Sequence, residues 1–501
     1  MDTFSNLIMG LSVALQPINL LYTLIGVITG ILVGVLPGLG PSGGLAILLP
    51  LTFGVNPVSA IMLLAGIYYG AMYGGSITSI IIGVPGDPAS VMTTIDGHKL
   101  ALQGRAGAAL GMACFASFIG GTLSVIAFTF LAPALASVTL SFGPPEYFAL
   151  MVLGLTTLAG MTGKDPLKGF MSAAFGLFLA SIGLDLVSGL PRFSFGRPEL
   201  YTGIDFIVVA MGVFGIAEVL VKEETQGTNN VKMDLRLTKL FPTLQDWAAS
   251  FWHIVGSTPL GFFIGMLPGA GATIATFISY GTAKRFSRDP EKFGEGTIEG
   301  VAAPECANNA AAIGAFIPLL TLGVPGSAST AVMMGALLML GLRPGPLLFS
   351  QNPDFIWGLI GSMYIGNLVL VILMLLAIPL ITRILTVPLA ILNPIVVAFV
   401  LVGAYTLNNS YFDVFLTILF GAIGYFMKKT EIPAAPMILA LVLGNLLENS
   451  MRQSLIISNG NPMIFISRPI AGVILIIAMA FVVIPLINSL RNYNKREKIA
   501  T

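Results

Sequence analysis

Residues 34–44 read GVLPGLGPSGG, and residues 265–273 repeat the pattern as GMLPGAGAT. Each run lies between two apolar stretches, so a membrane-spanning helix has to pass through it. Proline removes a backbone donor and glycine tolerates positive φ, and we therefore expect both helices to break there. A second signature, GVPG, occurs at residues 83–86 and again at 323–326. Two signatures that recur in the same order, 231 and 240 residues apart, predict a chain made of two duplicated halves.

The composition is that of an integral membrane protein. Of the 501 residues, 55 % are hydrophobic and only 9 % are charged, and the mean hydropathy is +0.91. A soluble protein carries about 25 % charged residues, because its surface has to be solvated. The net charge of +1 provides no electrostatic field for nucleic acid. These values exclude a soluble enzyme and a nucleic-acid-binding protein.

The apolar windows predict the fold class. They recur from residue 20 to residue 490, and several are interrupted by glycine or proline. One helical crossing needs roughly 20 apolar residues, which gives about 10–12 transmembrane helices for this chain. Irregular backbone at membrane depth has to line a cavity or be buried in protein. We therefore expect an all-α polytopic membrane protein with discontinuous helices, in contact with lipid.

The placement of cations predicts that the two halves have inverted topology. The residues after the second PGxG run include four cations, whereas the equivalent residues 53–60 of the first half include none; the cations are Lys284, Arg285, Arg288 and Lys292. Because positive loops stay on the cytoplasmic side, matched loops of different charge are expected on opposite sides of the membrane. The predicted organisation is a first transmembrane repeat at 1–221, a cytoplasmic linker at 222–246, a second repeat at 247–490 and a cytoplasmic tail at 491–501.

The breaks are candidate binding sites for an anion and a cation. A helix that restarts after a break presents free N–H groups and the positive end of its dipole, which suit a carboxylate. The carbonyl and hydroxyl oxygens of the broken segment suit Na⁺. Ser42 and Thr273 place a hydroxyl at the two PGxG breaks. The alternative is that each break is only a kink that lets helices pack closely.

Polar side chains also follow each GVPG turn. The first turn continues with Asp87 and Ser90, and the second with Ser327, Ser329 and Thr330. Such residues are natural N-caps of a new helix, and together with its free N–H groups they can also form an anion cradle. Asp87 is either a surface residue of the turn or a buried acid that binds a cation or a proton.

An alanine-rich stretch, residues 303–312, contains Glu305, Asn308 and Asn309. Polar groups of this kind are costly to bury without partners. Either they form hydrogen bonds between helices, or the two amides contact substrate or ion. With the breaks, the predicted substrate- and ion-binding residues are Pro37, Gly38, Gly40, Ser42, Gly43, Pro85, Gly86, Asp87, Ser90, Pro268, Gly269, Gly271, Thr273, Asn308, Asn309, Pro325, Gly326, Ser327, Ser329 and Thr330.

No catalytic motif occurs in the sequence. It contains no Walker A run, no nucleophile elbow, no HExxH motif and no CxxC motif. Cys114 and Cys306 lie in apolar surroundings and are expected to be packing residues. We therefore expect neither an enzyme nor a bound cofactor.

These motifs resemble a known family, the large membrane subunit of tripartite tricarboxylate transporters. The resemblance covers nearly the whole chain and rests on GVLPGLGPSGG at 34–44, GSITSIIIGVPGDPAS at 75–90, GMLPGAGA at 265–272, PECANNAAAIGAFIPLLTLGVPGSA at 304–328 and RPGPLLF at 343–349. It implies a secondary carrier that imports carboxylates such as citrate across the bacterial inner membrane. It also implies a coupling ion, Na⁺ or H⁺, and two partners, a periplasmic solute-binding protein and a small four-helix membrane subunit.

Two other functions stay open at this point. One is a standalone symporter of another organic anion, which needs no binding protein. The other is a membrane-embedded enzyme or structural subunit without a transport role, and the missing nucleophile and base argue against the enzyme. In either transporter, the predicted binding residues at the PGxG and GVPG runs and at Asn308 and Asn309 include no Lys or Arg, so backbone N–H groups, helix dipoles and hydroxyls would hold the carboxylate. The C-terminus is expected in the cytoplasm and the N-terminus outside.

Overall fold

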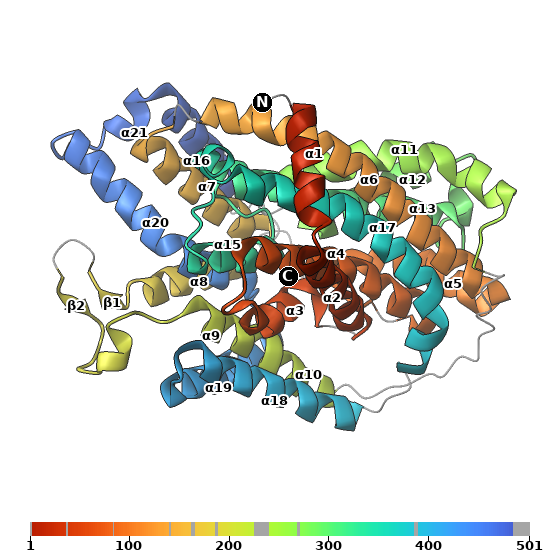
Figure 1. The fold of residues 1–501 in the computed structure, drawn as a ribbon, viewed down its shortest axis with the longest axis horizontal. Coiled ribbons are helices and arrows are strands. Elements are labelled where there is room, and N and C mark those ends of the chain that lie inside the picture. Colours follow the sequence, from red (N-terminus) through yellow and green to blue (C-terminus); the bar gives the residue numbers. More distant parts are fainter. Residues whose placement is uncertain are drawn as a thin grey trace, which may run out of the picture.

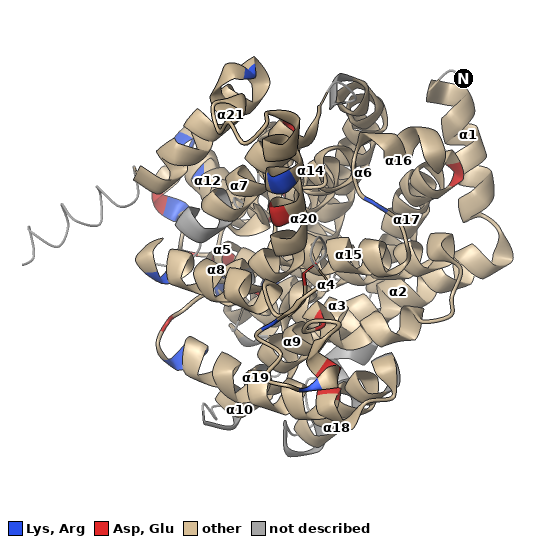
Figure 2. Cartoon of the chain, turned by 90° about the vertical axis from the view of Figure 1, so that its left-hand side faces the viewer, with Lys and Arg blue, Asp and Glu red and all other residues tan. Residues whose placement is uncertain are grey.

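The computed structural model of the chain describes residues 3–36, 39–83, 85–139, 142–161, 166–185, 189–224, 240–267, 271–384 and 389–483. These residues form a molecule built almost entirely of helices, with one short hairpin (Figure 1). Charged residues are sparse over the ribbon (Figure 2). The expected all-α polytopic membrane fold is confirmed.

The first half of the chain contains ten α-helices among its described residues. They are α1 Thr3–Ala14, α2 Pro17–Val35, α3 Gly40–Leu48, α4 Pro57–Ile82, α5 Val91–Leu100, α6 Ala106–Thr139, α7 Pro144–Met161, α8 Pro166–Ala180, α9 Phe206–Ala210 and α10 Ala217–Glu224. Short helical turns connect or extend them: η1 Leu49–Thr52, η2 Pro88–Ser90, η3 Ala101–Arg105, η4 Pro198–Leu200 and η5 Met211–Ile216. Strands β1 Gly183–Leu184 and β2 Pro191–Arg192 pair antiparallel, with Gly183 opposite Arg192.

The described part of the second half also consists of helices. Its described helices are α11 Leu244–Met266, α12 Gly271–Phe286, η7 Pro290–Lys292, α13 Glu299–Gly314, α14 Phe316–Leu322, α15 Ala328–Met339, α16 Pro346–Gln351, α17 Pro353–Ile384, α18 Leu389–Asn408, α19 Tyr411–Lys429, α20 Ala435–Ile457, α21 Ile464–Ser467 and a further apolar helix, Pro469–Val483.

Five helical segments in the described part of the chain are long and apolar enough to cross a membrane. They are Pro17–Val35, Pro57–Ile81, Pro88–Ser137, Pro353–Leu376 and Tyr411–Lys429. Seven shorter apolar helices accompany them. A crossing of the hydrocarbon core needs roughly 20 residues, so the total of about 10–12 crossings stays a prediction.

Small residues let the central helices approach closely. Helix α2 packs against α4, and α11 packs against α13. A Cβ atom added to Gly30 of α2 would lie 2.5 Å from the Ile67 carbonyl oxygen, and one added to Gly261 of α11 would lie 2.5 Å from that of Ala307. Such close contact is typical of helix pairs in membranes, where small residues bring the backbones together.

Helices from late in the two predicted halves pack across the molecule. Helix α20 lies against α7 and α8, whereas η5 and α10 lie against α19. A Cβ atom at Gly176 of α8 would lie 2.1 Å from the Met437 carbonyl oxygen, and one at Gly212 of η5 would lie 2.5 Å from that of Thr417. Each half is therefore completed by a segment of the other.

Both ends of the predicted linker at 222–246 are helical. Helix α10 reaches Glu224, and α11 begins at Leu244, so helix extends into the predicted 222–246 stretch. Thr243 caps α11, because its hydroxyl accepts a hydrogen bond from the Asp246 N–H at 3.2 Å. Residues 225–239 lie outside the described residues.

Candidate functional site

The helices break at the predicted glycine and proline runs. Helix α2 ends at Val35 and α3 begins at Gly40, and α11 ends at Met266 and α12 begins at Gly271. Gly40 has φ 61° and Gly271 has φ 59°. Helices α3 and α12 therefore both begin with a residue in the left-handed conformation, which only glycine adopts readily. Pro37, Gly38, Pro268 and Gly269, which were predicted to form these breaks, lie outside the described residues.

The GVPG turns have matching geometry as well. Helix α4 is followed by η2 and α14 by α15, and each new helix begins with a capping box. The Ser90 N–H donates to Asp87 Oδ1 at 2.9 Å, and the Thr330 N–H donates to Ser327 Oγ at 3.3 Å. The capping interpretation of these four side chains is therefore confirmed. These capping boxes use the backbone N–H groups of all four residues.

The PGxG and GVPG breaks of each half lie in contact. A Cβ atom at Gly86 would lie 2.6 Å from the Gly34 carbonyl oxygen, and one at Gly326 would lie 3.0 Å from that of Gly265. Across the two halves, α3 packs against α15 and η2 packs against α12. The N-terminal ends of α3, η2, α12 and α15 thus lie close together. They gather where α3, α4 and α15 meet near the middle of the molecule (Figure 1).

The remaining residues of the two GVPG turns line the same contacts. Pro325 and Gly326 are buried and Pro85 is partly buried, while Gly43 lies buried on α3. Ser329 is buried on the first turn of α15. These residues shape the backbone at the breaks rather than offering charged groups.

Two hydroxyls at the breaks remain free. The side chains of Ser42 on α3 and Thr273 on α12 are each half-buried. Neither hydroxyl forms a hydrogen bond with another described residue of the protein, so both can bind a ligand.

A tyrosine and an asparagine occupy equivalent positions in the two halves. Tyr68 on α4 is fully buried, and its hydroxyl lies 3.4 Å from Ser327 Oγ, the cap of α15. Asn308 on α13 follows Tyr68 by the same 240 residues that separate the GVPG turns. Its amide nitrogen donates a long hydrogen bond of 3.5 Å to the Met72 carbonyl, and its buried Oδ1 has no partner among the described groups. An unpaired buried oxygen is costly, which marks Asn308 as a candidate for ligand contact.

Asn309 has a simpler role. Its amide nitrogen donates to the Glu305 carbonyl oxygen one turn earlier, at 3.4 Å, and its side chain is 3 % exposed. This bond within α13 satisfies the amide without a ligand.

Glu305 on α13 is a fully buried acid. It was not among the predicted substrate- and ion-binding residues. Its Oε1 accepts hydrogen bonds from Ser76 on α4, at 2.7 Å, and from Thr93 on α5. Ser117 on α6 donates to Oε2 at 3.2 Å. Three helices of the first half thus meet one carboxylate of the second.

Asp96 on α5 is a second fully buried acid, held in a different way. Its Oδ1 accepts the backbone N–H groups of Gly294, Gly296 and Thr297 at 2.8–3.0 Å. Its Oδ2 accepts the hydroxyl of Tyr280 at 2.8 Å. Asp96 therefore fastens the loop before α13 to the first half.

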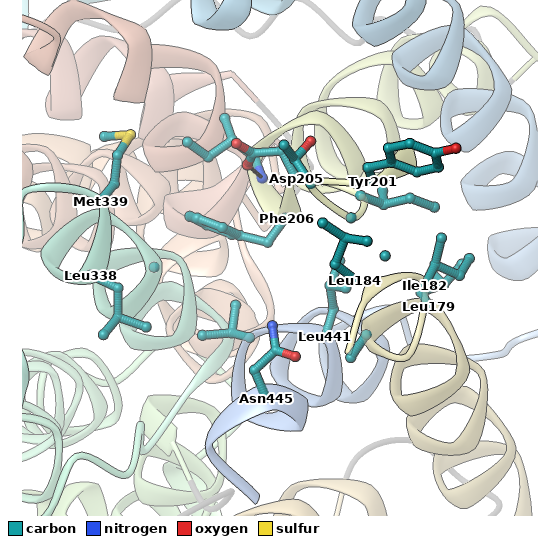
Figure 3. A pocket seen from close by; sticks show the side chains of 18 of the residues that line it. Leu179, Ile182, Leu184, Tyr201, Asp205, Phe206, Leu338, Met339, Leu441 and Asn445 are labelled. Carbon is teal, nitrogen blue, oxygen red and sulfur yellow. Dashed lines mark hydrogen bonds between the residues drawn. The ribbon is translucent and has the colours of Figure 1, made fainter. Parts of the chain in front are cut away.

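A cavity of about 630 Å³ lies at the far end of α15. It is bounded by the end of α8, strands β1 and β2, α9 and α20, and Figure 3 shows Asp205 and Tyr201 on one side and Asn445 on another. Its lining includes Gly335, Leu338 and Met339, whereas Ser327 caps the opposite end of α15. A helix of 12 residues is about 18 Å long, so the cavity and the breaks are separate places joined by one helix.

An ion-pair cluster of four residues ties this region together. Arg192 of β2 binds Glu448 on α20 at 2.9 Å, and Arg452 on α20 binds Asp185 at 2.7 Å. The two arginines and two acids cancel in charge, and they join the hairpin of the first half to the last long helix of the second. This contact holds α20 in place against the first half.

Tyr68 and Glu305 were not among the predicted site residues. Tyr68 has a signal in the sequence, because aligning the two GVPG turns places it opposite Asn308. The partners of Glu305 have none, since Ser76 lies 229 residues away and nothing local marks it as a neighbour.

Comparison with known proteins gives consistent matches. A family model described as "Tripartite tricarboxylate transporter TctA family" matches residues 20–439. A protein of Agrobacterium vitis, named "Uncharacterized 52.8 kDa protein in TAR-I ttuC' 3'region", is 44 % identical over 499 residues, which are 100 % of this chain and 99 % of that protein. A shorter one from the same organism, "Uncharacterized protein in TAR-II ttuC' 3'region", is 44 % identical over 239 residues, 48 % of this chain and 98 % of its own length. No solved structure matches.

Proposed function

Because the chain belongs to the tripartite tricarboxylate transporter TctA family, we propose that it is the permease subunit of an ion-coupled importer of citrate or a related di- or tricarboxylate. Membership makes it a component of a tricarboxylate transporter. The substrate, the coupling by Na⁺ or H⁺ and the residues below are our proposal.

The observation that carries the proposal is the meeting of the broken helices. Four helix starts, those of α3, α12, α15 and η2 with α5, gather at the breaks, and each α-helix that starts there places the positive end of its dipole at the breaks. Asn308 Oδ1 is buried and unpaired beside α4, and the hydroxyls of Ser42 and Thr273 are free. The N–H groups and the two hydroxyls favour a multiply charged anion without a fixed cation to hold it back. The amide oxygen of Asn308 can only accept, so it suits a cation or a protonated carboxylic acid.

The matching geometry of the breaks supports two inverted repeats. In carriers of that design, substrate and ion bind near the bilayer midplane at broken helices, and one part moves against the other to expose the site to each side in turn. We propose this mechanism here, in the bacterial inner membrane with the C-terminus in the cytoplasm. A periplasmic solute-binding protein would deliver the carboxylate, and a small four-helix membrane subunit would complete the system.

Removing the site groups should stop transport without unfolding the protein. In proteoliposomes that contain the chain, the small membrane subunit and the binding protein, we expect Asn308→Ala and Ser42→Ala to take up labelled citrate at least about tenfold more slowly, because one hydrogen bond to a charged group contributes about 1.5–3 kcal/mol. Gel filtration in detergent should show wild-type assembly for both variants.

The matched control is Ser12→Ala. The Ser12 hydroxyl donates to the Met9 carbonyl within α1 at 2.6 Å and is exposed, so uptake should not change. Wild-type uptake by both site variants would refute the site assignment. Uptake that persists without the binding protein would instead favour a standalone symporter.

A further inference from the structure

Glu305 lies in the middle of the packed helices without a cation to balance it. Its side chain is 0 % exposed, on a helix whose residues from Gly300 to Gly314 are all buried. Among the described residues, no Lys, Arg or His lies within ion-pair distance of it. A carboxylate in such a place is expensive to keep charged, because burial removes its hydration.

The charged and titratable groups on the helices around α13 leave Glu305 unpaired. Those that act on it are Asp87 beside η2, Tyr73 on α4 and Cys306 on α13 itself, none of them cationic. The others have partners or lie at helix ends: Asp96 with Tyr280, Cys114 beside Tyr73, Lys99 with Glu295, Arg105 with Asp246, His98 with the Ile80 carbonyl, His253 near Phe293, and the exposed Lys284 and Arg285.

The three groups that bind Glu305 are hydroxyls, and hydroxyls can reverse their hydrogen bonds. Ser76, Thr93 and Ser117 donate to a charged carboxylate, but each can also accept from a neutral carboxylic acid. Ser117 already has a second acceptor, because its Oγ lies 3.4 Å from the Glu305 carbonyl oxygen. If a proton binds at Oε2, the new O–H donates to Ser117 Oγ, and Ser117 donates to that carbonyl instead.

Asp96 is a second buried acid in the same fold, and its donors are of another kind. Three of its four donors are backbone N–H groups, which can only donate. Glu305 instead faces only hydroxyls, and these can bind either a carboxylate or a carboxylic acid.

Glu305 is also connected to the breaks. Thr93 lies on α5, which continues η2 and the cap Asp87 of the first GVPG turn. Ser76 follows Gly75, whose carbonyl accepts the Gly86 N–H at 3.4 Å. A change of charge at Glu305 therefore acts on both sides of the first break, where the substrate is proposed to bind.

From these contacts we propose that Glu305 is the site of the coupling proton, which binds to the carboxylate and leaves it once in each transport cycle. The proposal rests on the proposed function and specifies its coupling ion. The proton neutralises the acid at Oε2 while the Ser117 hydroxyl reorients, and its release restores the bond from Ser117 to the carboxylate.

Infrared spectroscopy of the membrane-embedded protein tests proton binding without any substrate. On titration from alkaline to acid pH, the wild type should gain the C=O band of a buried carboxylic acid, and Glu305→Gln should lack that band. Asp96→Asn is the matched control and should retain it. If the wild type and Glu305→Gln give the same titration, Glu305 binds no proton and the proposal fails.

Transport then tests coupling. In proteoliposomes with both partner subunits, an outside-acidic gradient of about one pH unit should raise citrate accumulation by the wild type by up to about tenfold per coupled proton. Glu305→Gln should lose this increase and keep exchange of internal for external citrate within about twofold of the wild type. Glu305→Asp, which retains a titratable group, should keep part of the increase, so a folding defect in one variant does not decide the result.

Different results refute the proposed transport function and the proton-binding role of Glu305. A wild type that exchanges no carboxylate refutes the proposed function, and the infrared titration still decides whether Glu305 binds a proton. Proton-driven accumulation that survives in Glu305→Gln refutes the coupling role alone. Accumulation that follows only a sodium gradient, and is lost in Glu305→Gln, refutes the proton assignment and places Na⁺ at this carboxylate.

Discussion

Asp96 accepts four hydrogen bonds, three from the backbone of residues 294–297 and one from Tyr280. A residue with so many buried donors should be essential for folding, whatever the protein transports. Replacing it by alanine leaves these donors without a partner. We therefore expect Asp96→Ala to lower the free energy of unfolding by about 3 kcal/mol, and Asp96→Asn, which keeps an oxygen there, by about 1 kcal/mol.

Thermal unfolding in detergent measures this difference. Asp289→Ala is the control, because Asp289 pairs with Lys292 at 2.8 Å on the exposed surface of the same connection. Exposed pairs contribute less than about 1 kcal/mol, so this variant should unfold close to the wild-type temperature. If Asp96→Ala were as stable as Asp289→Ala, the loop would not be fastened as the structure shows.

Individual residues differ in how far the sequence could predict them. Asp87, Ser90, Ser327 and Thr330 cap helices as expected, because a cap depends only on the next three residues. The setting of Glu305 could not be predicted, because its hydroxyl partners come from three helices that only tertiary packing brings together. Local chemistry is visible in a sequence, whereas contacts between distant helices are not.

At the scale of the elements, the breaks were the most predictable feature. Pro and Gly act on the backbone where they stand, so the ends of α2, α4, α11 and α14 fall at the expected runs. What could not be predicted is that the two kinds of break touch each other, with Gly86 on the Gly34 carbonyl and Gly326 on that of Gly265. It could also not be predicted that α20 packs on α7 and α8, or that η5 and α10 pack on α19.

The contact of Gly86 with Gly34 leaves less space for a side chain than the contact of Gly326 with Gly265, so the two positions should respond differently to the same substitution. A Cβ at Gly86 would lie 2.4 Å from the Gly75 Cα and 2.6 Å from the Gly34 carbonyl oxygen, both backbone atoms. A Cβ at Gly326 would lie no closer than 3.0 Å to any atom. Since overpacking costs about 1–3 kcal/mol, we expect Gly86→Ala to be destabilised by about 3 kcal/mol and Gly326→Ala by about 1 kcal/mol.

The two alanine variants are compared by thermal unfolding and by citrate uptake in the reconstituted system. Gly86→Ala should unfold at lower temperature and lose uptake, and Gly326→Ala should keep most of both. Equal loss in the two variants would contradict the asymmetry between the two GVPG turns.

At the scale of the whole molecule, the exchange of α20 and of η5 with α10 makes the halves depend on each other. We expect fragments 1–231 and 232–501, produced together, to form a complex that purifies through a tag on either fragment. Each fragment alone lacks the partner surface that α7 and α8, or α19, require, and should be degraded. The cut falls between α10 and α11, outside the described residues, so it removes no contact named above.

Immunoblots of membranes from cells that express one fragment or both provide the measurement. The intact chain is the reference for abundance. If either fragment accumulated alone to the level of the intact chain, the halves would be independent folding units and the crossed packing would not be needed for stability.

The crossed packing also sets an order of events during synthesis. Helices α7 and α8 leave the ribosome when α20, which begins at residue 435, has not yet been translated. Their contact face, including the groove at Gly176, must therefore be covered by lipid until the C-terminal part of the chain is inserted. The final step of folding is then an exchange in which α20 displaces lipid from a helix pair already in the bilayer. Maturation of this protein should consequently be slowest after translation has ended, and sensitive to the lipids that occupy the groove.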